Sequence, residues 1–340
     1  MDAKKQFHRI GSAVVTIALL ILSACSGKAK QLDSNYHIST EVQSSNEEFP
    51  TGLNCPDEIE VFTDDPTVAW SAGIFVYLYN QEINEDIMSP AYMVYHYDGG
   101  EIDARIDIGS NIDRKQSFSI MILADGRPIS FSLEDKTSQS HEVTIHGGTQ
   151  SIRVHFDPEF SSGRVDFLLL YQGDVNIEYY SSYWTIYLGD MAAEAEIDSA
   201  DLIEAAEQIV PVRHMANGYS LFGILREPFS ADENFSYSGG TEFVPGDRCG
   251  VLLDLVSGYE GIFRTTCFAD NNVLPFTLEG HSFESFVWKS SSETMIHRNI
   301  ELDLDDWEGK IFYTVSVPLE RKSIDKPPLV SVKYRLKEAQ

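Results

Sequence analysis

The chain has 340 residues, with 53 acidic and 25 basic side chains and a formal net charge of −28 at pH 7. Nucleic acids and anionic lipid head groups are bound through Lys and Arg, so this balance argues against both as partners of the folded surface. Aromatic residues make up 11% of the sequence, which excludes a mostly disordered chain.

The first 24 residues have the pattern of an export signal. Lys4, Lys5 and Arg9 precede the apolar run "IGSAVVTIALLIL" over residues 10–22. A membrane span needs about 20 apolar residues, so this run is short for a transmembrane helix. A basic start, a short apolar core and small residues together predict a signal peptide over residues 1–24.

The end of this segment, Leu22-Ser23-Ala24-Cys25, resembles the lipobox of bacterial lipoproteins. The resemblance implies cleavage before Cys25 and a diacylglyceryl anchor on its thiol, with palmitate-type acyl chains that attach the chain stably to a membrane. It also implies a place in the cell envelope, on the extracytoplasmic face of the cytoplasmic membrane or on an outer membrane where one is present. An uncleaved anchor and an ordinary signal cut at a small residue are the alternatives.

The residues after the cysteine are rich in Ser, Asn, Glu and Gln and show no apolar periodicity. This composition is typical of a flexible linker. We therefore expect residues 25–50 to be a lipidated cysteine followed by a flexible tether that lifts the folded part off the membrane.

Short β-strand patterns fill most of the remaining chain. Ala104, Ile106 and Ile108 alternate with polar residues, and comparable runs return about every 10 residues between Gly, Asp, Asn and Pro, as in antiparallel sandwiches. One face of each strand is expected to supply the core while the other faces water.

The body also contains an internal repeat. Three pairs of segments show it: 104–108 with 249–253, 118–134 with 263–279, and 154–171 with 300–317. The first two pairs are 145 residues apart, and the third needs a shift of one residue that matches Arg164 with Lys310. This order predicts a duplicated β domain, the alternative being a chance likeness between two β-rich stretches.

One segment departs from the β pattern. Residues 192–210 are rich in Ala and Glu, begin near the possible helix caps Asp198 and Ser199, and are followed by Pro211. The predicted architecture is therefore all-β, with two tandem antiparallel Ig-like β-sandwich domains over residues 51–190 and 213–340 and a short helical connector over residues 191–212. A helix packed onto one sandwich is the alternative.

Cys249 and Cys267 flank a turn signal at residues 257–260 and would face each other in a hairpin centred there. Export permits oxidation, and a disulfide forms where the two Cα atoms are about 4.4–6.8 Å apart. A disulfide and two buried thiols both remain open at this point.

The sequence contains no pattern typical of a catalytic or cofactor site, such as a zinc-binding His-Glu-x-x-His or a nucleophile elbow. We predict no catalytic residue, no cofactor and no metal site. The weak calcium candidate is the acidic stretch with Asp303, Asp305 and Asp306, whose oxygens suit a hard cation. Asp and Gly in a turn between strands explain the same stretch without a metal.

The aromatic stretch "YYSSYW" is the candidate contact surface. Tyr179 and Tyr183 share one face of a strand, and Tyr180 and Trp184 share the other. Tyr and Trp are enriched at binding hot spots, so an outward face could contact a ligand. Aromatic side chains that fill the edge of a sandwich are the alternative.

These features together predict a membrane-anchored extracytoplasmic lipoprotein. Its expected role is non-catalytic: binding, adhesion or scaffolding toward an extracytoplasmic protein, peptide or glycan, with the membrane as second partner through the lipid. The two alternatives are a cell-wall or glycan-acting hydrolase with a site between the domains, and an accessory factor in envelope assembly or secretion.

Overall fold

The computed structural model describes residues 72–88, 92–172, 181–191, 197, 209–211, 224–226, 242–243, 250–256, 260–278, 280–290, 294–303, 308–321, 325–331 and 333–336. These residues are essentially all-β, in several sheets, as predicted. The expected signal peptide, Cys25 and the tether lie outside the described residues. Within the described part, no helix is long and apolar enough to cross a membrane.

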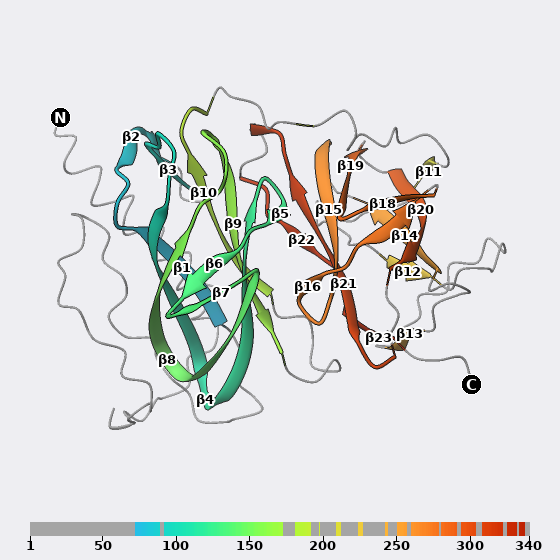
Figure 1. Ribbon diagram of the computed structural model, residues 1–340, viewed down its shortest axis with the longest axis horizontal. Coiled ribbons are helices and arrows are strands. Elements are labelled where there is room, and N and C mark those ends of the chain that lie inside the picture. Colours follow the sequence, from blue (N-terminus) through green and yellow to red (C-terminus); the bar gives the residue numbers. More distant parts are fainter. Residues whose placement is uncertain are drawn as a thin grey trace.

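We call the strands β1–β10 the first half of the body and β11–β23 the second half; the two lie next to each other (Figure 1). The first half contains β1 (Ala72–Leu78), β2 (Ile83–Met88), β3 (Met93–Tyr95), β4 (Ile102–Ala124), β5 (Arg127–Pro128), β6 (Phe131–Leu133), β7 (Lys136–Ser138), β8 (Ser140–Phe156), β9 (Gly163–Tyr171) and β10 (Ser181–Leu188). They form one sheet in the order β2-β3-β10-β9-β4-β8-β6-β7, with β1 and β5 also paired to β4.

The second half contains β11 (Ile209–Pro211), β12 (Ile224–Arg226), β13 (Glu242–Phe243), β14 (Gly250–Val256), β15 (Gly261–Ala269), β16 (Asn272–Val273), β17 (Phe276–Leu278), β18 (His281–Phe283), β19 (Ser285–Ser290), β20 (Thr294–Leu302), β21 (Ile311–Pro318), β22 (Leu329–Val330) and β23 (Tyr334–Leu336). Among the described residues they form two sheets, β12-β14-β20-β17-β18 and β13-β23-β21-β15-β16. β11 pairs with β20, β19 with β15, and β22 with β21.

Equivalent strand pairs recur in the two halves. The hairpin β6–β7 corresponds to β17–β18, and the β6–β8 pair, with Phe131 opposite Phe156, corresponds to β17–β20, with Phe276 opposite Leu302. The parallel pair β3–β10 has its counterpart in the parallel pair β13–β23. The repeat seen in the sequence is therefore accompanied by recurring strand pairing.

The long strands β4 and β8 explain why the halves look different. The pairing between them shifts register between Ser110 and Lys115. Before this shift β4 also pairs with β1, and after it β4 also pairs with β9. In the second half the two stretches that match β4 are separate strands, β14 and β15, which lie in different sheets. The hairpin predicted around residues 257–260 is therefore wrong.

Alternating apolar residues form a separate core in each half. On β8, Val143 and Ile145 are buried while Glu142, Thr144 and His146 are exposed, which is the expected period of two. The first core is built mainly from β1, β4, β8 and β9, and the second mainly from β14, β15, β17, β19, β20 and β23.

The helical connector is not confirmed. Its last described residues, Ile209–Pro211, form the strand β11 and pair with β20 from Ile296 to Thr294. Except for Ile197, which has no regular secondary structure, residues 192–208 lie outside the described residues. Tertiary pairing has overridden the helix propensity at the end of this segment.

A buried polar junction between the two halves

The two halves meet through outer sheet faces that carry apolar side chains. A third core cluster combines Met121, Leu123, Leu168 and Leu170 of the first half with Phe268, Tyr313, Val315 and Val317 of the second. Met121, Leu168 and Val317 are fully buried. The prediction that the outer strand faces contact water is therefore wrong for β4, β9, β15 and β21, and we call this contact the junction.

An ion pair is buried at one side of the junction. Arg164 Nε and Nη2 donate to the two carboxylate oxygens of Asp166, both at 2.7 Å, and the two residues are 2% and 0% exposed. Thr185 donates to the same carboxylate at 2.6 Å. Arg164 Nη2 also donates to the Lys326 carbonyl at 2.8 Å, so this first-half ion pair is tied to the second half. Burying a charge pair is tolerated only when its hydrogen bonds are satisfied in this way.

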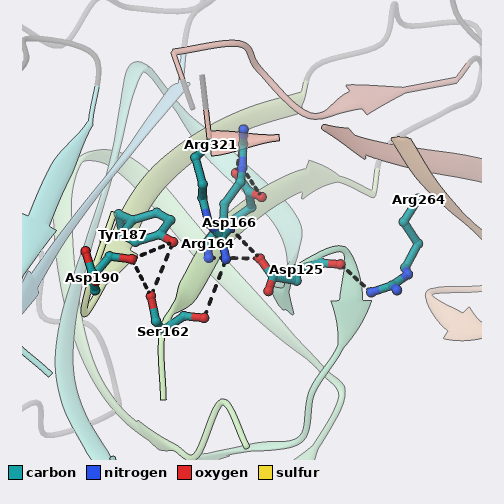
Figure 2. Close-up of polar contacts among 8 residues, drawn as sticks. All are labelled: Asp125, Ser162, Arg164, Asp166, Tyr187, Asp190, Arg264 and Arg321. Atoms are coloured by element: carbon teal, nitrogen blue, oxygen red, sulfur yellow. Dashed lines mark hydrogen bonds and ion pairs between the residues drawn. The ribbon is translucent and has the colours of Figure 1, made fainter. Parts of the chain in front are cut away.

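The turn between β4 and β5 is the second element of the junction. Asp125 and Gly126 have φ angles of 43° and 80°, as a two-residue type I′ turn requires. Arg321 Nη1 lies 3.1 Å from Asp125 Oδ1, and Arg264 Nη1 donates to the Asp125 carbonyl at 2.7 Å (Figure 2). Both arginines come from the second half, so they hold the turn of the first.

Gly126 lies close against the second half. Thr266 donates to its carbonyl at 3.2 Å, and a Cβ at this position would meet Arg264 Cβ at 3.1 Å and Val317 Cβ at 3.2 Å. The sequence "ADGR" therefore has glycine both for its positive φ angle and for this close approach.

An aromatic side chain completes the same cluster. The Arg321 guanidinium lies 4.6 Å from the centroid of the Tyr187 ring, an attractive cation–π geometry. The Tyr187 hydroxyl lies 3.3 Å from Ser162 Oγ and 3.4 Å from the Asp190 carbonyl (Figure 2). Burial raises the pKa of Tyr187, although its hydrogen bond to Ser162 and the charge of Arg321 act in the opposite direction.

The other side of the junction contains a partly buried lysine. Lys333 Nζ donates to the Tyr171 carbonyl at 2.9 Å and lies 5.1 Å from the centroid of the Tyr313 ring. The Tyr313 hydroxyl donates to Asn271 Oδ1 at 2.9 Å and also contacts Met121 Sδ at 3.5 Å. Burial lowers the pKa of Lys333 to about 8, because an ammonium group is poorly solvated here.

The predicted aromatic contact surface is divided between surface and interior. Tyr183 is 42% exposed, next to Leu168 in the sheet and therefore at the rim of the junction. Trp184 points the other way and packs on the first core, 5.0 Å from Phe75 between ring centroids. Tyr179 and Tyr180 lie outside the described residues. Of the four, Tyr183 is thus the residue that the structure places at the surface.

The structure describes only some of the other predicted residues. Cys267 is a free, buried thiol, and Cys249 lies outside the described residues. Asp303 is exposed, and its backbone N–H donates to the Pro275 carbonyl at 2.9 Å, whereas Asp305 and Asp306 are not described. Among the described side chains, no three His, Cys, Asp or Glu residues are grouped so that they could hold a metal ion.

Sequence reasoning missed the junction, although a signal for it was present. The runs "SIMILA" and "VDFLLLY" are apolar on both faces of their strands, which indicates strands covered on both sides. Arg164 and Asp166 are two positions apart in such a run and therefore share one face of the strand. Their position in an apolar run indicated that they form a buried ion pair and do not face solvent.

Comparison with known proteins gives no family. No protein-family model matches the chain, and no curated protein matches it. Similar solved structures include a FixG-related protein from Vibrio parahaemolyticus, with 9% identity, a TM-score of 0.22, and coverage of 34% of this chain and 94% of that one. The YadV chaperone has 8% identity, a TM-score of 0.21, and coverage of 77% and 99%. The McoA multicopper oxidase from the hyperthermophile Aquifex aeolicus has 12% identity, a TM-score of 0.21, and coverage of 72% and 57%. Likenesses this low support no conclusion about function.

Proposed function

We propose that the chain is an extracytoplasmic lipoprotein, anchored through Cys25, whose β body is a non-catalytic binding or scaffold module for a protein, peptide or glycan of the cell envelope. The anchor rests on the order of charge, apolar core, small residues and cysteine in residues 1–25. The body would consist of two tandem Ig-like β-sandwich domains joined through residues 191–212. The recurring strand pairs of the two halves support this division.

The observation that carries the non-catalytic role is the use of the polar groups at the junction. Asp125 and Asp166 bind Arg321 and Arg164, and these two guanidinium groups also bind the backbone carbonyls of Ser162 and Lys326 across the junction. A hydrolase with its site between the domains would need carboxyl groups open to substrate and water. Asp125 instead binds Arg321 of the second half, and Asp166 is occupied by Arg164, whose guanidinium reaches the Lys326 carbonyl of the second half. Carboxylates used in this way suit a rigid module that presents its outer surface.

Tyr183 is the proposed contact residue on that surface. Its ring combines an exposed apolar face with a hydroxyl, and its base is held by the well-ordered pairing of β10 with β9. A rigid aromatic side chain binds a partner with little loss of rotamer entropy.

The anchor is tested in the native host with the full chain and with Cys25→Ser. The unaltered protein should fractionate with membranes and carry an acylated residue 25 by mass spectrometry, and the variant should lose both properties. An unmodified residue 25 in a cytosolic protein would overturn the proposal.

The contact surface is tested by placing a photoreactive amino acid at Tyr183 in the anchored protein, with Lys136 on β7 as the control position. Lys136 is also exposed but lies on the edge strand β7, five positions from β10 in the strand order. We expect an adduct with an envelope component from position 183 and none from position 136. Equal adducts from both positions, or none from 183, would contradict a specific contact at Tyr183.

A further inference from the structure

The faces that meet at the junction are equivalent faces of the two repeats. The hairpins β4–β5 and β15–β16 align at an offset of 145 residues, which matches Met121 with Thr266 and Leu123 with Phe268. The pairing of β9 and β21 with these strands sets an offset of 147 residues there, which matches Leu168 with Val315 and Leu170 with Val317. All eight residues are buried, and seven of them belong to the third core cluster, while Thr266 bonds across the junction to Gly126.

Contacts at the two ends of the junction follow the same equivalence. At one end, the turn residue Gly126 contacts Thr266. By the offset of 145, the counterpart of this contact joins Asn271 to Met121. The structure brings these two side chains together on the Tyr313 hydroxyl, which lies 2.9 Å from Asn271 Oδ1 and 3.5 Å from Met121 Sδ.

Two copies of one surface that pack on each other are related by an approximate two-fold axis, as in an isologous homodimer. We propose that the junction is a self-complementary interface of this kind, so that the chain is a single-chain counterpart of a symmetric dimer. Each half is the specific partner of the other, and the contact holds without the covalent link through residues 192–208.

The composition of the junction supports docking that does not need the link. Its centre is apolar and fully buried, and hydrogen-bonded charges such as Asp125 and Arg321 lie at its border. An apolar centre with a polar rim is the usual build of a stable protein–protein interface. The junction also buries the outer faces of β9 and β21, so an external partner must bind to another surface.

The experiment uses the full chain with a protease site placed within residues 192–208. The folded protein is cut under native conditions, and its fragments are followed by size-exclusion chromatography and native mass spectrometry on dilution. We expect the two fragments to stay together as a 1:1 complex at micromolar concentration. Separation of two folded fragments at that concentration would overturn the proposal.

Variants then assign the contact to the equivalent faces. Leu123→Asp and Phe268→Asp, at matching positions, should each weaken the fragment complex at least tenfold, and by similar factors. An unchanged complex in either variant would contradict the equivalence of the faces.

A milder variant avoids the risk that a charge in the junction prevents folding. In Gly126→Asn the new Cβ would crowd Arg264 and Val317, whereas Gly309→Asn has the same φ angle of 80° and open space around its Cβ. The first should weaken the complex and the second should not. Equal effects would show that the close approach at Gly126 does not contribute to docking.

Discussion

Asp125 and Asp270 occupy matching turns, 145 residues apart, and each carboxylate accepts a hydrogen bond at 2.9 Å from the backbone N–H of a facing strand. The donor is Arg164 in the first half and Ile311 in the second. The structural counterpart of Arg164 is therefore Ile311, and the predicted match with Lys310 is one residue off. Lys310 instead bonds to the Asp270 side chain at 3.3 Å.

The two aspartates should respond differently to loss of charge. An Asp→Asn change keeps the acceptor oxygen and tolerates positive φ, so it removes mainly the ion pair. The partners of Asp270 are solvent-exposed, and we expect Asp270→Asn to change the free energy of unfolding by less than about 0.5 kcal/mol. Asp125 pairs with Arg321 in a mostly buried place, and Asp125→Asn should cost about 1–2 kcal/mol. Urea denaturation of both variants checks this, and equal losses would contradict it.

The parts of the fold that sequence could predict are those encoded by local period. The alternation of apolar and polar residues on β8 predicted a strand with one buried face, and the matching turns at Asp125 and Asp270 indicated the repeat. Strand alternation and turn geometry both depend on residues that are close together in the sequence. The disagreement over β14 and β15 has a different origin. A turn signal at residues 257–260 specifies a change of direction but not whether the next strand pairs back or crosses to another sheet.

The candidate site depended on contacts that local pattern does not specify. Tyr187 and Arg321 are 134 positions apart in the sequence, and their stacking exists only because the two halves dock. Tyr183 stays at the surface, whereas Tyr187, on the same face of β10, is fully buried between Val94 of the first half and Arg321 of the second. The alternation of side chains along β10 predicts that Tyr183 and Tyr187 share one face of the strand, but it does not indicate which residues cover that face.

The ion pair of Arg164 and Asp166 gives a prediction about buried charge. Asp166→Leu leaves the Arg164 guanidinium buried without its carboxylate and should destabilise the protein by about 3–5 kcal/mol. The double variant Arg164→Met with Asp166→Leu should recover most of that loss, since the second half has Ile311 and Tyr313 at the matching positions. A double-mutant cycle by chemical denaturation measures the coupling. A double variant as unstable as the sum of its singles would show that the pair's charge is not the cause.

The Cys267 thiol should be inert in the folded protein. Complete burial raises its pKa above the usual range, and the thiolate is the form that reacts with alkylating agents. We expect no labelling by iodoacetamide at pH 8 under native conditions and full labelling after unfolding without reductant. Peptide mass spectrometry provides the readout. Protection of both Cys267 and Cys249 after unfolding would indicate the disulfide instead, and fast native labelling would contradict the burial.

Lys333 should make the stability of the junction depend on pH. Its pKa is about 8 in the folded protein and 10.5 as the reference value, so between these values the unfolded chain binds more protons than the folded one. The contribution of Lys333 to the free energy of unfolding therefore increases as pH rises from about 8 toward 10, with a slope of at most about 1.4 kcal/mol per pH unit.

The variant Lys333→Met isolates this effect, because it keeps the length of the side chain and removes the charge. The difference in unfolding free energy between the unaltered protein and the variant should move in favour of the unaltered protein as pH rises through that window. Tyrosines with raised pKa values, such as Tyr95 and Tyr97 at about 12, act in the opposite direction above pH 10, which is why the window ends there. Lys136→Met, at an exposed position on β7, is the control and should leave the pH profile unchanged. Parallel profiles for the unaltered protein and Lys333→Met would mean that this ammonium group is solvated in the folded state.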